Sequence, residues 1–161
     1  MADIKLSQAD METLNAFESW LNSMEGFPGM SYTQDSMKAN LRIHFCDQEG
    51  MLILMGEEFN DVDGAVTFWY HDDRIDNAII CYRTDITQHV RNSVILEEIY
   101  NGLGPIQDTD LREDSLIWSG YSSPQWLTEE DTLLLTLLYH PDLKPGMNLE
   151  QCAEAIRRIY Y

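Results

Sequence analysis

Apolar residues form strand-like patterns in three segments in the first half of the chain. Between residues 41 and 45 every second position is apolar, which is the pattern of a strand with one buried face. Ala65–Tyr70 and Ala78–Tyr82 predict two more strands, and the polar segment Asp61–Gly64 predicts a turn before the first of these two. The expected sheet therefore lies in the first half of the chain.

Four segments instead show apolar residues at helical spacing. Capping boxes, in which two residues three positions apart satisfy each other's backbone amides, begin three of these helices. They run from Ser7 to near Gly26, over Thr128–Leu138 and over Asn148–Ile159. A further helix between Val90 and Leu103 ends at Gly104-Pro105, a common helix terminator.

The segment between residues 106 and 126 has no clear period. It is rich in Asp, Ser, Gly and Pro, and ordered loops of this length are often functional. The order of elements predicts an α+β fold with a mixed sheet, the 90–103 helix at its centre and two C-terminal helices. Because 161 residues suffice for one sizeable core, we expect a single domain over residues 1–161.

The chain is strongly acidic. It has 28 Asp and Glu against 10 Lys and Arg, a formal charge of −18, and the acids are spread over both halves. Such a field repels nucleic acid and anionic membranes, and its simplest consequence is a soluble surface. No apolar run approaches the roughly 20 residues that span a bilayer, and Met1–Asp10 lacks the blocks of a signal peptide. We therefore expect no nucleic-acid partner and no direct membrane insertion by this chain.

The three cysteines lie far apart in the sequence. Cys46, Cys81 and Cys152 have no paired short spacing, which argues against a zinc knuckle or a redox pair. Cys46 and Cys81 both fall in strand-like segments and could face each other across the sheet. The spacing also argues against a disulfide framework; one bridge between these two cysteines is possible, but buried free thiols are the commoner outcome.

The helix expected at 90–103 carries the layout of a metzincin zinc site. Such a site needs two histidines four residues apart, a glutamate beside the first, a glycine where the chain turns, and a third ligand beyond it. Glu98 and Gly104 occupy the glutamate and glycine positions. Glu97, Asn101 and Gln107 stand where the three histidines would be. The pattern predicts the scaffold of a zinc site without its zinc ligands.

A second stretch continues the same pattern. Metzincins follow this helix with a methionine-containing turn, a Leu-Thr-x-x-Asp helix start and a Leu-x-x-Leu-Tyr ending. This chain has Asp114–Ile117, with Ile117 in the place of the methionine, then Leu127–Asp131 and Leu135–Tyr139. The chain therefore resembles a zincin-like, metzincin-type domain whose zinc-binding histidines are replaced.

The combined motifs also resemble an uncharacterised bacterial family of lipoprotein-type proteins. The matching segments are Arg91–Glu98, Leu103–Gly104, Asp114–Ile117 and Leu138–Met147, and the resemblance covers at least residues 39–161. That family has no established activity, so the resemblance implies a fold and a compartment rather than a reaction. The implied location is extracytoplasmic or at the cell surface if an export signal was removed, and cytoplasmic otherwise.

Glu98 has two interpretations. As a catalytic base it would activate a metal-bound water, although oxygen donors at the three ligand positions suit calcium, magnesium or manganese better than zinc. As a structural residue it would be an interior polar anchor. A buried carboxylate needs a partner: Arg91 or Arg83 would supply the charge, or backbone amides under the long loop would donate hydrogen bonds to it.

The loop after the helix carries a dense group of acids. Oxygen donors at alternating positions are typical of calcium sites, and Asp108, Asp110 and Asp114 are the candidates for a weak one. The loop lacks the glycine and glutamate pattern of an EF-hand. A solvated acidic loop is the alternative.

The same loop carries three aromatic residues, Trp118, Tyr121 and Trp126. Exposed aromatic side chains in this region would mark a peptide-binding groove. Buried ones would belong to the core.

We therefore expect a noncatalytic, zincin-like binding or structural domain that has no cofactor and an unidentified protein or peptide partner. Two functions of other classes remain open. One is an acidic inhibitor or nucleic-acid mimic that binds a basic protein, and the other is a hydrolase that uses a metal other than zinc. The surroundings of Glu97, Glu98 and Asn101 distinguish these hypotheses.

Overall fold

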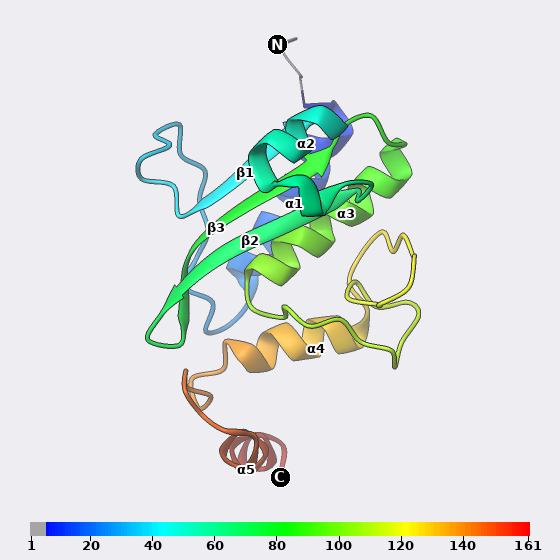
Figure 1. Cartoon of the computed structure of the whole chain (residues 1–161). Coiled ribbons are helices and arrows are strands. Elements are labelled where there is room, and N and C mark those ends of the chain that lie inside the picture. The colour runs from blue at the N-terminus through cyan, green and yellow to red at the C-terminus, as the bar shows by residue number, and fades with distance from the viewer. Residues whose placement is uncertain (1–5) are drawn as a thin grey trace.

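The computed structural model describes residues 6–161, and over this range it has an α+β fold (Figure 1). Residues 1–5, half of the segment in which we expect no export signal, lie outside the described residues. In chain order the elements are α1 (Gln8–Ser23), β1 (Leu41–Cys46), α2 (Gln48–Met55), a 3-10 turn (Glu57–Phe59), β2 (Gly64–His71), β3 (Arg74–Arg83), α3 (Gln88–Gly102), α4 (Glu129–Leu138) and α5 (Leu149–Tyr160).

The three strands form the mixed sheet that the sequence predicts, and the structure gives their order as β1-β3-β2. β3 is the middle strand and pairs in parallel with β1 and antiparallel with β2. The β2–β3 hairpin turns at Asp72 and Asp73, whose φ angles of 50° and 60° lie in the left-handed region that Asp tolerates in tight turns. β2 is one of the two edge strands, and it begins at Gly64, the last residue of the predicted Asp61–Gly64 turn.

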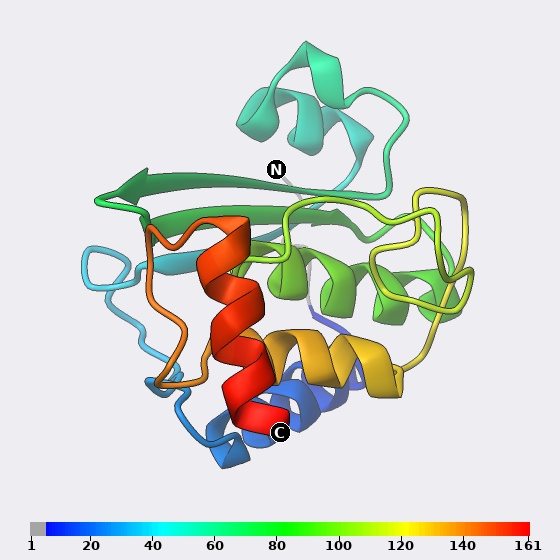
Figure 2. The ribbon, with the colours of Figure 1, turned by 90° about the horizontal axis from the view of Figure 1, so that it is seen from below.

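Helices cover both faces of the sheet (Figure 2). α2 lies on one face, whereas α3 packs on the other against β2 and β3, and α1 packs against α3. The central strand alternates between the two layers, since Ile80 and Tyr82 belong to the main core on the α3 side while Cys81 packs with Met51 on the α2 side. α3 is thus the central helix, as we expect from its place in the sequence.

The predicted capping boxes are confirmed. Ser7, Thr128 and Asn148 each accept a backbone hydrogen bond three residues on, at the first residues of α1, α4 and α5. α3 begins after Thr87 and is followed by Gly104 at φ 136°, a conformation that side chains rarely adopt. The capping and termination signals therefore place these helices correctly.

Two elements, helix α2 and the 3-10 turn that follows it, are not predicted from the sequence. Helix α2 follows β1 directly and is capped by Asp47, whose side chain accepts from the Gly50 amide. Its residues 51–55 are all apolar, so they show no helical period, and Ile53 remains 67% exposed. A continuous apolar run of this length does not distinguish a helix from a strand.

Cys46 and Cys81 are joined by a disulfide between β1 and β3. Both are buried and pack with Met51 of α2, so the bond fixes the sheet beneath that helix. Of the two alternatives that the sequence leaves open, the structure has the bridge. Cys152 is free.

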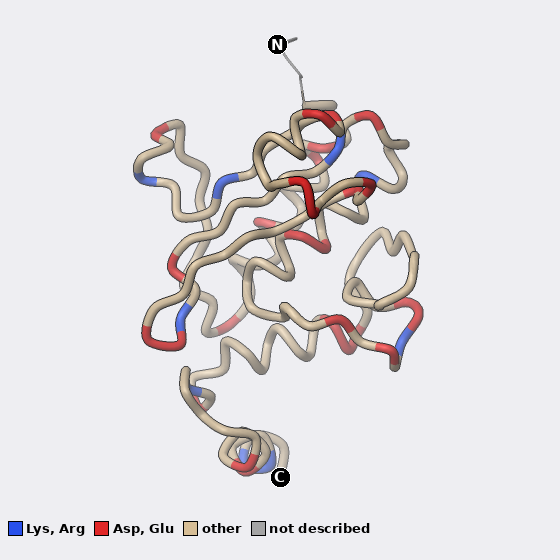
Figure 3. The backbone as a smooth tube through the Cα atoms, in the orientation of Figure 1, with Lys and Arg blue, Asp and Glu red and all other residues tan. Residues whose placement is uncertain are grey.

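Among residues 6–161, no helix combines the length and the apolar character needed to cross a bilayer. The acidic side chains occur in many separate segments of the chain, at helix ends, at turns and along α3 (Figure 3).

Candidate functional site

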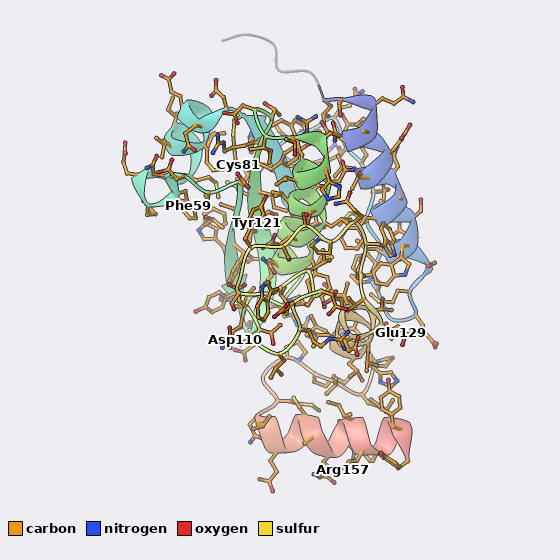
Figure 4. All side chains as sticks on the ribbon, turned by 90° about the vertical axis from the view of Figure 1, so that its right-hand side faces the viewer. Phe59, Cys81, Asp110, Tyr121, Glu129 and Arg157 are labelled. Atoms are coloured by element: carbon orange, nitrogen blue, oxygen red, sulfur yellow. A yellow bond between two sulfur atoms is a disulfide. The ribbon has the colours of Figure 1, made fainter. Side chains whose placement is uncertain are left out.

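An open cleft of about 490 Å³ lies where the start of β2, helix α3 and the irregular segment after α3 meet. The loop that carries Asp110 and Tyr121 passes in front of α3 (Figure 4). The cleft is lined by Asp61, Val62, Asp63, Gly64, Val90, Val94, Glu97, Glu98, Asp108, Leu116, Trp118, Ser119, Gly120, Tyr121 and Ser122. Five of these residues are acids, and none of the lining residues described is Lys, Arg or His.

Gly64 lets β2 approach α3 at the floor of the cleft. A Cβ atom at this position would lie 2.3 Å from Cγ1 of Val94 and 2.8 Å from Oε1 of Glu98. Any larger residue would therefore push the start of β2 away from the helix. The close approach explains why Glu98 is only 7% exposed although it lines an open cleft.

Glu98 is buried without a partner. In the described part of the chain, its carboxyl group makes no hydrogen bond or ion pair with another side chain or with the backbone. Burial raises the pKa of Glu98 well above its usual range, and the neighbouring charges of Glu97 and Asp108 raise it further. Such a group is costly to ionise in the empty cleft.

Glu97 lies beside Glu98 at the same cleft. Burial raises the pKa of Glu97 to about 7, and the charges of Asp108 and Asp63 contribute in the same direction. Two adjacent carboxyl groups with raised pKa values in a cleft are typical of functional sites, although structural networks also produce them.

Arg91 and Arg83, the expected partners of Glu98, are engaged elsewhere, so the expected pairing is wrong. Arg91 donates from Nε to Asp10 at 2.7 Å, which ties α3 to α1 in the core. Arg83 makes two hydrogen bonds to Asp85, at 2.9 and 3.0 Å, and approaches Asp63 at 4.0 Å. Both arginines therefore pair with other carboxylates, and neither pairs with Glu98.

The other two positions of the expected ligand set are not among the residues that line the cleft. Asn101 is one turn after Glu97 on α3, and its side-chain oxygen is buried without a hydrogen-bond partner. Gln107 is exposed beyond the end of the helix. Within residues 6–161, no three His, Cys, Asp or Glu side chains converge on a point where they could hold a metal ion.

The three acids considered for calcium do not converge either. Asp108 lines the cleft, whereas Asp110 accepts from the Ser119 hydroxyl and Asp114 makes two hydrogen bonds with Arg112, both at 3.0 Å. The Arg112 guanidinium lowers the pKa of Asp114. These contacts hold the loop together.

Two of the three aromatic candidates reach the cleft. Trp118 and Tyr121 line it, and Tyr121 is 80% exposed at the rim. The indole of Trp118 packs over Gly120, where an added Cβ would lie 2.3 Å from Nε1. Trp126 instead packs edge-on against Phe17, with ring centroids 6.0 Å apart.

A buried carboxylate anchors the cleft wall formed by the irregular segment. Asp131 of α4 accepts from the Ser115 hydroxyl at 2.6 Å, from the Leu116 amide at 3.2 Å and from its own cap residue Thr128 at 3.0 Å. Because the 114–117 turn is held in this way, Leu116 stays against α3 under the cleft. The wall opposite β2 is therefore a fixed surface of the fold.

The sequence pattern places Asp61, Asp63 and Gly64 only in a turn and does not predict their contribution to the cleft. Their role depends on where β2 begins relative to α3, and no local pattern encodes that distance. An Asp-x-Asp-Gly segment directly before a strand is the single available signal.

No curated protein and no solved structure matches the chain. A model for the family "Protein of unknown function (DUF2927)" matches residues 5–158, which is nearly the whole chain, and the protein therefore belongs to that family.

Proposed function

We propose that the chain is a noncatalytic, zincin-like binding domain that holds a segment of a partner polypeptide in the cleft beside α3. The observation that carries the proposal is Glu98, a carboxyl group that is buried at an open cleft without a partner from the chain. A buried carboxyl group without a partner lowers the stability of the folded chain, and destabilising groups of this kind are common at binding sites.

The donor set argues against zinc-hydrolase chemistry. Zinc at hydrolytic sites takes imidazole or thiolate ligands together with carboxylates, at tetrahedral spacing. Here Glu97 lines the cleft, but Gln107 is exposed beyond the helix and Asn101 is outside the lining. A hydrolase that uses another metal would need the same three positions to converge, so the geometry favours binding.

A location outside the cytoplasm fits the disulfide. Cys46 and Cys81 form a buried bond, and bonds of this kind persist in oxidising compartments and are rare in the cytosol of mesophiles. We therefore propose that the domain belongs to a cell-surface or lipoprotein-type protein of a bacterium.

The charge distribution favours the cleft over a nucleic-acid mimic. A mimic presents rows of carboxylates at phosphate-like spacing on one face, whereas the acids here lie in scattered segments (Figure 3). The charge gives the surface solubility, and the local density at the cleft gives the specificity.

A display selection tests the proposal. Random 12-residue peptides are selected against the chain and then compared on two variants, Ser122→Trp, which fills the cleft, and Ser36→Trp, which makes the same change on the exposed 31–40 loop. We expect enriched peptides that bind the wild type and Ser36→Trp but lose binding to Ser122→Trp. Failure to enrich any peptide, or equal binding to both variants, would contradict the proposal.

A further inference from the structure

The cleft beside α3 combines three features that match one chemical group. Its floor holds the unpartnered Glu98, its inner wall is apolar at Val94 and Leu116, and its rim carries Trp118 and Tyr121. A group that satisfies all three has an apolar stem, a cationic head and an affinity for aromatic faces.

We propose that this cleft holds a basic side chain, an arginine or a lysine, of the bound polypeptide, with Glu98 accepting hydrogen bonds from its cationic head. This inference rests on the proposed binding function and specifies what that site recognises.

The charge of the lining supports a cation. Besides Glu98, the carboxylates of Asp61, Asp63, Glu97 and Asp108 line the cleft, and no cationic residue among those described lines it with them. Arg83, which lies 4.0 Å from Asp63 and also interacts with Asp61, offsets part of this field. A cleft with one sign of charge and low-dielectric walls concentrates its field and attracts ions of the opposite sign.

The burial of Glu98 makes the interaction selective. Leaving a carboxylate buried without a partner costs far more than the same group costs in water, and a cationic donor at hydrogen-bond distance removes that cost. A neutral ligand of the same shape would leave Glu98 uncompensated. The cleft should therefore discriminate by charge more strongly than a solvent-exposed acidic patch does.

The apolar and aromatic surfaces favour a side chain over a bare ion. Lys and Arg bury their methylene stems along apolar surface while the head reaches polar groups, and Val90, Val94 and Leu116 line the cleft with apolar atoms here. Trp118 and Tyr121 can then face the cation with their rings. A metal ion would gain no favourable interaction from these apolar and aromatic side chains. In the described part of the chain, no three His, Cys, Asp or Glu side chains converge to coordinate one.

The test uses a single arginine side chain as the probe. N-acetyl-arginine methylamide is titrated into the full chain, and chemical-shift changes in α3 are followed by NMR; N-acetyl-citrulline methylamide, which has nearly the same shape and no charge, is the matched ligand. We expect saturable shifts at residues 94–98 with the arginine probe and binding at least roughly tenfold weaker with the citrulline probe, since charge-assisted hydrogen bonds are about twice as strong as neutral ones.

Two variants locate the charge that matters. Glu98→Gln should weaken the arginine probe by a similar factor, whereas Glu154→Gln, which makes the same change on an exposed position of α5, should leave its binding unchanged. The inference is overturned if the arginine probe does not bind, if citrulline binds equally well, or if Glu98→Gln binds the arginine probe like the wild type. Peptides from the display selection that still require the open cleft would then leave the proposed binding function standing.

Discussion

Replacing Glu97 with glutamine should stabilise the chain above neutral pH and change little at acidic pH. The pKa of Glu97 is about 7 in the folded chain and 4.5 for the unperturbed group, because burial and the charges of Asp108 and Asp63 disfavour ionisation. Between these two values the folded chain binds more protons than the unfolded chain at this site. Stability therefore falls as pH rises from about 5 and is fully lowered above the folded pKa.

The magnitude follows from the difference between the two pKa values. Each pKa unit corresponds to about 1.4 kcal/mol, so the full shift of Glu97 amounts to about 3 kcal/mol. The side chain retains some contact with solvent, which screens the interaction and reduces the expected effect to about 1–3 kcal/mol. For a chain of this length 1 kcal/mol moves the melting temperature by about 2–4 °C.

Thermal and urea unfolding of the oxidised chain at pH 5 and pH 8.5 measure this effect. The melting temperature of Glu97→Gln should be close to that of the wild type at pH 5 and several degrees higher at pH 8.5. The melting temperature of Glu154→Gln, on the exposed face of α5, should equal that of the wild type at both pH values. The reasoning is refuted if Glu97→Gln and the wild type have the same pH dependence, or if the glutamine variant is the less stable of the two at pH 8.5.

Three further outcomes are expected. Gly64→Ala should destabilise the chain by about 1–3 kcal/mol in urea unfolding, because its Cβ would clash with α3. Gly102→Ala should not destabilise it, because the Cβ at this position would meet only ordinary contacts beyond 3.4 Å. Equal losses of stability in the two variants would contradict the close approach of β2 to α3. Asp131→Ala should lower the free energy of unfolding by about 2–4 kcal/mol and increase amide exchange over residues 114–118, because it leaves three hydrogen-bond donors unsatisfied. Unchanged amide exchange would show that other contacts hold the loop. Elemental analysis of the purified chain after dialysis against zinc should find no stoichiometric metal, and one tightly bound zinc per chain, lost in Glu97→Ala, would overturn the noncatalytic assignment.

The elements that the sequence predicts correctly have local signals. Ser7, Thr128 and Asn148 each begin a helix with a capping box, formed with the residue three positions further on. The alternation between residues 41 and 45 likewise predicts a strand without information from the rest of the chain. The position of the Glu97-Glu98 helix at the centre of the fold could also be predicted, because strands precede it and a long loop follows it.

The features that could not be predicted depend on distances between segments. Asp10, about eighty residues before Arg91, takes the arginine that we expected for Glu98, and nothing near either residue indicates this pairing. The approach of Gly64 to α3 likewise appears only once β2 is placed in the sheet. Both facts change the role of Glu98 from a paired interior anchor to an unpaired carboxyl group at a cleft.

The most direct test of a noncatalytic binding cleft is the fate of a peptide that occupies it. A peptide from the display selection is incubated with the chain in the presence of zinc, manganese or calcium, the complex is isolated, and the peptide is analysed by mass spectrometry. We predict an intact peptide bound at one per chain and released by Ser122→Trp but retained by Ser36→Trp. Cleaved peptide that depends on Glu98 and on an added metal would contradict the account.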